Sequence, residues 1–327
     1  MNRFRALFPV LVLMIAGHRT LNAQPARDGY VATSDSVRLY YRVIGSGRDT
    51  IVVLHGGPGM TMDYLIPDFV PLSARHTLIA YDQRGSGRST APLDAAHITL
   101  ANHVSDLEAI RRRFALSRMT ILGHSWGGRL AALYASRHPD EVARLILVDP
   151  GPARTDPRFA QNVVAWMDSG MRTRVGLLGE AARAPSGDRI QACQAFWHEF
   201  IRGYWSDPND TIAIGRMRGT ICAYPTAIRD MDAVGQLTLA SVGARDYSSD
   251  MSVVKRPVLI VAGHNSPMPL ENSEAWASAF PDARLLVVDR SGHFPHVEQP
   301  RLVFDAVETF LKGGWPPAAR KVERRVP

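Results

Sequence analysis

Six short, almost wholly apolar runs recur along this chain and constrain its fold more than any other feature. They are residues 51–54, 77–81, 119–122, 145–148, 258–261 and 285–288. Runs of this length without polar alternation are typical of strands buried on both faces of a sheet. Segments of helical length and spacing lie between them, at 100–114, 126–137, 271–280 and 302–311. This α/β alternation predicts a mostly parallel central sheet with helices on both faces.

Residues 151–250 interrupt the rhythm of strands and helices. They contain no short buried-strand run, and their aromatic residues have spacings that suit amphipathic helices. We expect a helical insertion that lies as a cap over the strand ends, with most of these aromatic side chains packed inside it. The predicted core is therefore split into residues 24–150 and 251–312, and residues 313–327 form a basic, disordered tail.

The net charge of +7 is concentrated at the two ends of the chain. Three arginines and no acid lie in residues 1–23, and the tail from Lys312 carries the rest of the excess. The remaining body is close to neutral, which gives no electrostatic footprint for nucleic acid.

The N-terminus has the pattern of an export signal. Arg3 and Arg5 precede an apolar run from Ala6 to Gly17, and Ala23 offers a small residue at the cleavage position. We therefore predict a signal peptide at residues 1–23 and a secreted or periplasmic protein; an uncleaved anchor or a buried first helix is the alternative. No later stretch approaches the length of a membrane span, so we expect no stable membrane insertion after cleavage.

Export would place the two cysteines, Cys193 and Cys222, in an oxidising compartment. We expect them to form a disulfide, and two separate buried thiols are the alternative. Two cysteines are too few for a four-thiolate zinc site.

Gly123-His124-Ser125-Trp126-Gly127 matches the pattern G-x-S-x-G and lies between an apolar run and a helical segment. A strand, a sharp turn and a helix are the context that a nucleophile elbow requires, so Ser125 is the candidate nucleophile.

An earlier loop, His55-Gly56-Gly57-Pro58-Gly59, also follows a buried run. Its glycines allow a backbone N–H to face a developing oxyanion, with the N–H of Trp126 as second donor. A phosphate-binding loop is excluded because no Gly-Lys-Ser/Thr follows.

These motifs, together with residues 82–89 (DQRGSGRS) and Gly292-His293, resemble the α/β-hydrolase superfamily. The pairing of HGGPG with DQRGSGRS is most similar to the proline iminopeptidase branch. The resemblance covers residues ~30 to 312, as judged from the motif positions, and is weak over the cap. It implies an oxyanion hole made by the N–H groups of Gly57 and Trp126. Asp82 and Arg84 are expected to brace their loop.

His293 follows the last predicted strand, where a histidine can reach across the sheet edge to the serine. It is therefore the candidate general base and acid. His264, His124 and His296 are weaker candidates.

The sequence departs from the superfamily at the acid. Ser266 stands where the acid usually follows the penultimate strand, and a serine cannot carry the charge that orients an imidazolium. Some members carry the acid after the strand that follows the nucleophile helix, and here that residue is Asp149. Glu271 and Asp289 are alternatives, as is a Ser-His dyad without an acid.

The motifs predict a serine hydrolase that cleaves a peptide or ester carbonyl through an acyl-enzyme, without metal or cofactor. The resemblance favours an aminopeptidase that acts on short peptides. Cap carboxylates would then hold the substrate ammonium, and Glu199, Asp230 and Asp232 are candidates, although none matches a family motif. A carboxylesterase with the same triad and a non-catalytic binding protein are the alternatives. An aspartate nucleophile is absent, which disfavours a dehalogenase or an epoxide hydrolase.

Overall fold

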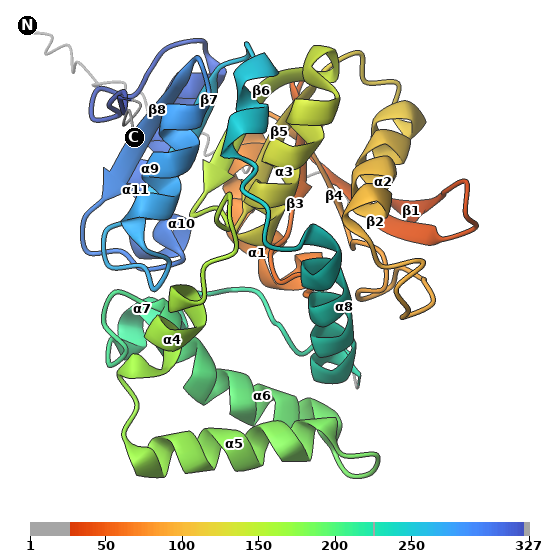
Figure 1. The fold of residues 1–327 in the computed structure, drawn as a ribbon, viewed down its shortest axis with the longest axis vertical. Coiled ribbons are helices and arrows are strands. Elements are labelled where there is room, and N and C mark those ends of the chain that lie inside the picture. The colour runs from red at the N-terminus through yellow and green to blue at the C-terminus, as the bar shows by residue number, and fades with distance from the viewer. Residues whose placement is uncertain (1–26, 225, 324–327) are drawn as a thin grey trace, which may run out of the picture.

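The computed structural model describes residues 27–224 and 226–323. The predicted signal peptide lies outside these residues. The chain forms one eight-stranded sheet in the order β1-β2-β4-β3-β5-β6-β7-β8 (Figure 1). The strands are β1 (Arg27–Ala32), β2 (Arg38–Ile44), β3 (Thr50–Leu54), β4 (Thr77–Tyr81), β5 (Met119–His124), β6 (Val142–Val148), β7 (Val258–Gly263) and β8 (Ala283–Val288). The six apolar runs are all strands, so the predicted fold class is confirmed. The alternation of residues 37–43 also predicts a strand, which is β2, whereas β1 was not predicted.

Strands β3 to β8 pair in parallel, while β1 and β2 are antiparallel additions at one edge. Alternate residues of the inner strands face opposite sides of the sheet, as the pleat requires. Val52 and Leu54 pack with one set of helices, and Ile51 and Val53 pack with the other. Both faces are thereby sealed, which explains the lack of polar alternation in these runs.

Helices cover both faces of the sheet. One face packs against α2 (Leu100–Arg113), α3 (Trp126–Arg137) and α9 (Leu270–Ala279), and the other against α1 (Ile66–Phe69) and α11 (Pro300–Leu311). The short helix α10 (Pro295–Glu298) precedes α11. Because all parallel strands point the same way, their carboxyl ends and the loops that follow them meet at one edge of the sheet.

The segment between β6 and β7 is helical. Its helices are α4 (Arg158–Ala165), α5 (Ser169–Arg183), α6 (Arg189–Phe200), α7 (Thr211–Gly215) and α8 (Ala227–Val242). Figure 1 shows α5 and α6 side by side at a distance from the sheet, while α8 returns toward it. We call this segment the cap. No helix in the described part of the chain is long and apolar enough to cross a membrane.

The tail prediction is wrong for the part of the tail that the structure describes. Arg320 forms a pair of backbone hydrogen bonds with Leu285 of β8, at 2.8 and 2.9 Å, and Ala319 is buried. Strand β8 is an edge of the sheet, so its outer N–H and C=O groups lack a neighbouring strand. The tail supplies partners for one residue of that edge, and the Arg320 guanidinium contacts Glu274 at 2.9 Å.

Candidate active site

Ser125 lies on a strained turn between β5 and α3. Its φ of 55° and ψ of −121° are outside the regions that a serine ordinarily adopts, and its N–H donates to the carbonyl of Val148 at 3.0 Å. Glycines make the turn possible. A Cβ on Gly123 would lie 2.3 Å from the carbonyl oxygen of Gly127, and one on Gly127 would lie 2.3 Å from that of Leu54. Only glycine permits both approaches.

The turn places Ser125 directly before the N-terminus of α3. The Ser125 carbonyl accepts hydrogen bonds from Gly128 and Arg129 at 2.9 and 3.1 Å. Trp126 is the first residue of the helix, so its N–H has no acceptor within the helix. This N–H and the positive end of the helix dipole favour negative charge beside the serine.

The glycine loop after β3 lies against the serine. A Cβ on Gly56 would be 3.0 Å from the Cβ of Ser125. The N–H of Gly56 is already engaged, because it donates to the hydroxyl of Tyr64 at 2.7 Å. The next N–H belongs to Gly57, whose φ of +121° favours glycine. Of the two predicted oxyanion donors, Trp126 directly follows Ser125 in the chain, and Gly57 directly follows Gly56, the residue that lies against the serine.

The structure brings His293 and Asp149 together at the carboxyl edge of the sheet. Nδ1 of His293 contacts Oδ2 of Asp149, and the two side chains are only 2% and 1% exposed. The other carboxylate oxygen, Oδ1, accepts from the N–H of Gly263 at 3.2 Å. With Nδ1 occupied, Nε2 is the ring nitrogen left to exchange a proton. Ser125, Asp149 and His293 follow β5, β6 and β8 respectively.

The alternative acids lie elsewhere. Glu271 is exposed on α9 and is 3.9 Å from Arg158. Asp289 is also exposed and contacts His264 at 3.1 Å. Asp149 is the one of the three predicted candidates whose carboxylate contacts the imidazole of His293.

The other candidate histidines have different surroundings. His264 is largely exposed. His296 is buried and stacks on Phe69 with ring centroids 4.6 Å apart, and burial lowers its pKa to about 3. His124 is buried next to the nucleophile, and burial lowers its pKa well below the usual value. Its Nε2 lies 2.8 Å from the carbonyl of His293, so it supports the histidine loop through the backbone.

Ser266 contacts the acid directly. Its hydroxyl donates to Oδ2 of Asp149 at 2.5 Å and accepts from the N–H of Met268 at 3.0 Å. The sequence indicated only that Ser266 cannot be the acid; it gave no signal that this side chain meets Asp149.

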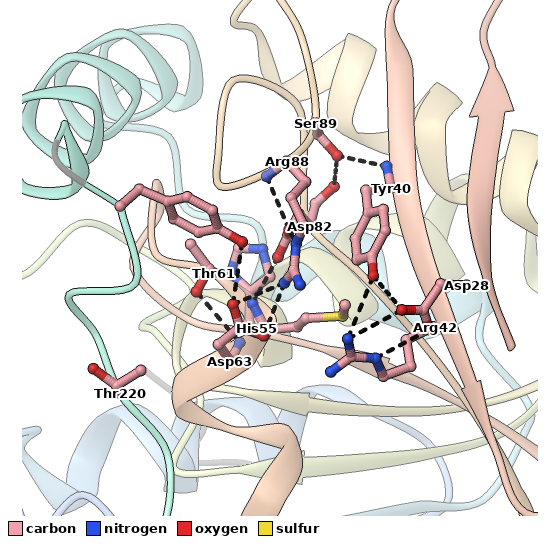
Figure 2. Close-up of polar contacts among 12 residues, drawn as sticks. Asp28, Tyr40, Arg42, His55, Thr61, Asp63, Asp82, Arg88, Ser89 and Thr220 are labelled. Carbon is pink, nitrogen blue, oxygen red and sulfur yellow. Dashed lines mark hydrogen bonds and ion pairs between the residues drawn. The ribbon is translucent and has the colours of Figure 1, made fainter. Parts of the chain in front are cut away.

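The loop of residues 82–89 is held by ion pairs, as predicted. Arg84 is buried and binds Asp106 through Nε and Nη2 at 2.7 and 2.6 Å. Figure 2 shows Arg88 between two carboxylates: its Nε is 3.0 Å from Asp82, and its Nη2 is 2.8 Å from Asp63. Asp63 lies in a 3₁₀ turn, Met62–Tyr64, so this network fixes the segment that follows the glycine loop.

The cap contributes to the surroundings of His293. The rings of Phe159 and Tyr204 lie 5.2 and 5.5 Å from the imidazole, measured between centroids. The carbonyl of Tyr204 accepts from the N–H of His293 at 2.6 Å. These two aromatic residues therefore contact the site, whereas the sequence suggested mainly core packing for cap aromatics. The signal that could have found them is weak, because contacts between cap and core leave no periodic pattern.

Glu298 was also missed by the sequence analysis. Its carboxylate accepts from Gly292 at 2.6 Å and from Ser206 of the cap at 3.0 Å, and burial raises its pKa. A Cβ on Gly292 would lie 2.3 Å from the carbonyl of Tyr204. The histidine loop and the cap are thus in close contact.

Each of the three cap carboxylates that are candidates for binding the substrate ammonium group forms an ion pair with an arginine. Glu199 is 3.3 Å from Arg202, Asp232 is 2.5 Å from Arg183, and Asp230 is 3.4 Å from Arg229. In residues 27–224 and 226–323, no group of three or more His, Cys, Asp or Glu side chains is arranged to hold a metal ion.

The two cysteines meet within the cap. Cys193 of α6 and Cys222 form a disulfide, with their Cα atoms 5.8 Å apart. Both are buried, and the bond joins α6 to the segment that precedes α8.

A sheet of this topology, with a serine on a strained strand-to-helix turn and a histidine after the last strand, defines an α/β hydrolase. A family model described as alpha/beta hydrolase fold matches residues 49–300, so the chain belongs to this family and is a hydrolase. Within the family, the chain lies near the proline iminopeptidase branch.

Two curated relatives support that position, and one solved structure shares the fold. A proline iminopeptidase of Saccharolobus solfataricus is 41% identical over 275 residues, which cover 83% of this chain and 87% of the relative. One from Heyndrickxia coagulans is 25% identical over 275 residues, 81% of this chain and 91% of the relative. The crystal structure of a proline iminopeptidase from Mycobacterium smegmatis superposes with a TM-score of 0.62 at 23% identity, covering 88% of this chain and 98% of that one. At that identity the superposition is evidence for the fold alone.

Proposed function

We propose that this hydrolase is a serine hydrolase in which Ser125, His293 and Asp149 form the catalytic triad. The observation that carries the proposal is the buried contact between Nδ1 of His293 and Oδ2 of Asp149. This contact fixes the tautomer in which Nε2 is unprotonated and can accept the hydroxyl proton of Ser125.

The reaction follows from these positions. The Ser125 oxygen attacks the substrate carbonyl while its proton passes to Nε2 of His293. The N–H groups of Gly57 and Trp126 stabilise the oxyanion of the tetrahedral intermediate. His293 then donates the proton to the leaving group, and an acyl-enzyme remains. A water molecule, deprotonated by His293, attacks this acyl group and releases the second product and the free serine.

We further propose that the substrate is a short peptide whose N-terminal residue is removed. The curated relatives named proline iminopeptidase support this substrate class. Hydrolysis of proline, alanine and leucine arylamides, measured beside short p-nitrophenyl esters, tests it. Hydrolysis of the esters with no hydrolysis of any arylamide would contradict the proposed aminopeptidase activity.

A carboxylesterase is the second candidate, and one observation favours it. The three cap carboxylates already contact arginines, while aromatic rings of Phe159 and Tyr204 flank His293. An apolar acyl group would suit such surroundings better than an ammonium group. The same substrate panel separates the two candidates.

A non-catalytic binding protein is the outcome if Ser125 is unreactive. A fluorophosphonate probe should label Ser125 in the folded protein and not after heat denaturation. We also propose export of the protein, and the N-terminal sequence of the mature protein from a periplasmic or secreted fraction tests cleavage after Ala23.

A further inference from the structure

We infer that Ser266 is a positioning residue that holds the carboxylate of Asp149 toward His293. This inference rests on the proposed triad. Ser266 follows β7, at the place where the superfamily usually carries the acid itself. Asp149 follows β6, the neighbouring parallel strand, so the two residues meet at the same edge of the sheet. In this chain the proposed acid follows β6, and a serine follows β7 in its place.

The direction of the hydrogen bond is determined by its partners. The hydroxyl of Ser266 has one proton. The N–H of Met268 donates to the hydroxyl oxygen at 3.0 Å, so the hydroxyl proton is free for another acceptor. The ionised carboxylate of Asp149 can only accept, and its Oδ2 lies 2.5 Å away. Ser266 therefore donates to Asp149.

This donor restricts the rotation of the carboxylate. Oδ2 receives hydrogen bonds from both Ser266 and His293, while Oδ1 receives one from the N–H of Gly263. Asp149 has a left-handed backbone conformation, with a φ of 42°, and its N–H donates to Val261 at 2.7 Å. Without the hydroxyl of Ser266, His293 would be the one remaining partner of the two that contact Oδ2. The carboxylate could then turn away from the imidazole.

The chemistry also explains why position 266 holds a hydroxyl. A carboxylate at position 266 would lie beside the carboxylate of Asp149, and two negative charges in contact repel each other. A neutral donor stabilises the single negative charge without adding another. A hydrogen bond to a charged group inside a site is among the stronger ones.

Ser266→Ala tests the inference. We expect kcat to fall about 10- to 100-fold, because the acid loses its orientation, while KM changes less than about twofold. Ser266→Thr retains the hydroxyl and should restore kcat to within about threefold of the wild type. Ser273→Ala removes another buried serine, on α9, and should change neither constant.

The same substitution in an Asp149→Asn background isolates the route of the effect. If Ser266 acts through the carboxylate, Ser266→Ala should lower kcat by less than about twofold in the Asp149→Asn background. An unchanged kcat in the single variant, an equal loss in both backgrounds, or a loss that Thr does not restore would each overturn the inference. Fluorophosphonate labelling and turnover of the wild type test the proposed function separately, since they do not depend on Ser266.

Discussion

The hydroxyl of Tyr64, in the 3₁₀ turn after the glycine loop, lies 2.8 Å from Nδ1 of His124, the residue directly before Ser125. The carbonyl of His293 can only accept, so Nε2 of His124, 2.8 Å away, carries the proton and donates to it. Nδ1 of the neutral ring is then an acceptor, so the hydroxyl of Tyr64 donates to it while accepting from the N–H of Gly56. A neutral His124 therefore connects the glycine loop to the histidine loop.

The nucleophile can be tested by Ser125→Ala. Loss of the attacking oxygen should lower kcat by at least about 10⁴-fold, with the fold retained because alanine differs only by the hydroxyl. Hydrolysis rates and the melting temperature provide the measurement, and Ser273→Ala is the matched control. Activity near that of the wild type would show that Ser125 is not the nucleophile.

The acid can be tested by Asp149→Asn. The substitution keeps the shape of the side chain but lets His293 adopt the wrong tautomer, so kcat should fall by about two to four orders of magnitude. KM should change little, because Asp149 contacts His293 and not the substrate. Glu271→Gln and Asp289→Asn should have mild effects, since both carboxylates are exposed and paired elsewhere. Steady-state kinetics with an ester or arylamide distinguish the three.

A carboxylate moved to position 266 should replace the acid in part. In the Asp149→Asn background, Ser266→Asp should raise kcat by about 10-fold, because position 266 approaches the same side of His293. In the wild-type background the same substitution should lower activity, since two carboxylates would compete for one site. Lack of any recovery in the double variant would place position 266 outside reach of His293.

The disulfide can be tested by counting thiols. Protein exported into an oxidising compartment and then unfolded without reductant should contain no alkylatable thiol. The bond joins residues separated by 29 positions, and a loop of that length corresponds to about 3.5 kcal/mol of stability in the chain-entropy model. A Cys193→Ala/Cys222→Ala variant should therefore melt at a lower temperature, and reductant should not lower it further. Two thiols in the wild type would rule the bond out.

Stability should fall in acid because burial lowers the pKa of four histidines in the described part of the chain. Burial lowers the pKa of His103 to about 3, against a usual value of 6.5. Below pH 6.5 the unfolded chain binds a proton that the folded chain excludes, so stability is present above this pH and is lost as the pH falls toward 3. His103 alone should contribute a slope of about 1.4 kcal/mol per pH unit in this window. Burial also lowers the pKa values of His55, His124 and His296.

Denaturant unfolding between pH 7 and pH 4 measures this effect. His103→Gln should reduce the slope of unfolding free energy against pH, whereas His264→Gln, at an exposed position, should leave it unchanged. Identical slopes for wild type and His103→Gln would contradict the assignment of His103 as a buried neutral side chain.

The sequence by itself determined the sheet and the nucleophile turn. Both depend on local patterns: apolar runs that need two covered faces, and glycines at Gly123 and Gly127 where a Cβ would collide with backbone oxygens. Each of these requirements involves only a few residues that are adjacent in the sequence. The proposed oxyanion donors also came from the sequence: Trp126 from its place at the start of a helix, and Gly57 from the resemblance to the superfamily.

Only the tertiary structure decided which carboxylate meets His293. The sequence favoured Asp149, because it follows the strand after the nucleophile helix, but it left Glu271, Asp289 and a dyad without an acid open. The order of β6, β7 and β8 brings Asp149 and Ser266 together beside His293, while Glu271 and Asp289 face solvent. The tertiary structure also decided the conformation of the tail around Arg320, because its partner there is Leu285 at the edge of β8. Contacts between segments far apart in the chain leave no periodic signal, since they arise from the direction and order of strands that only folding sets.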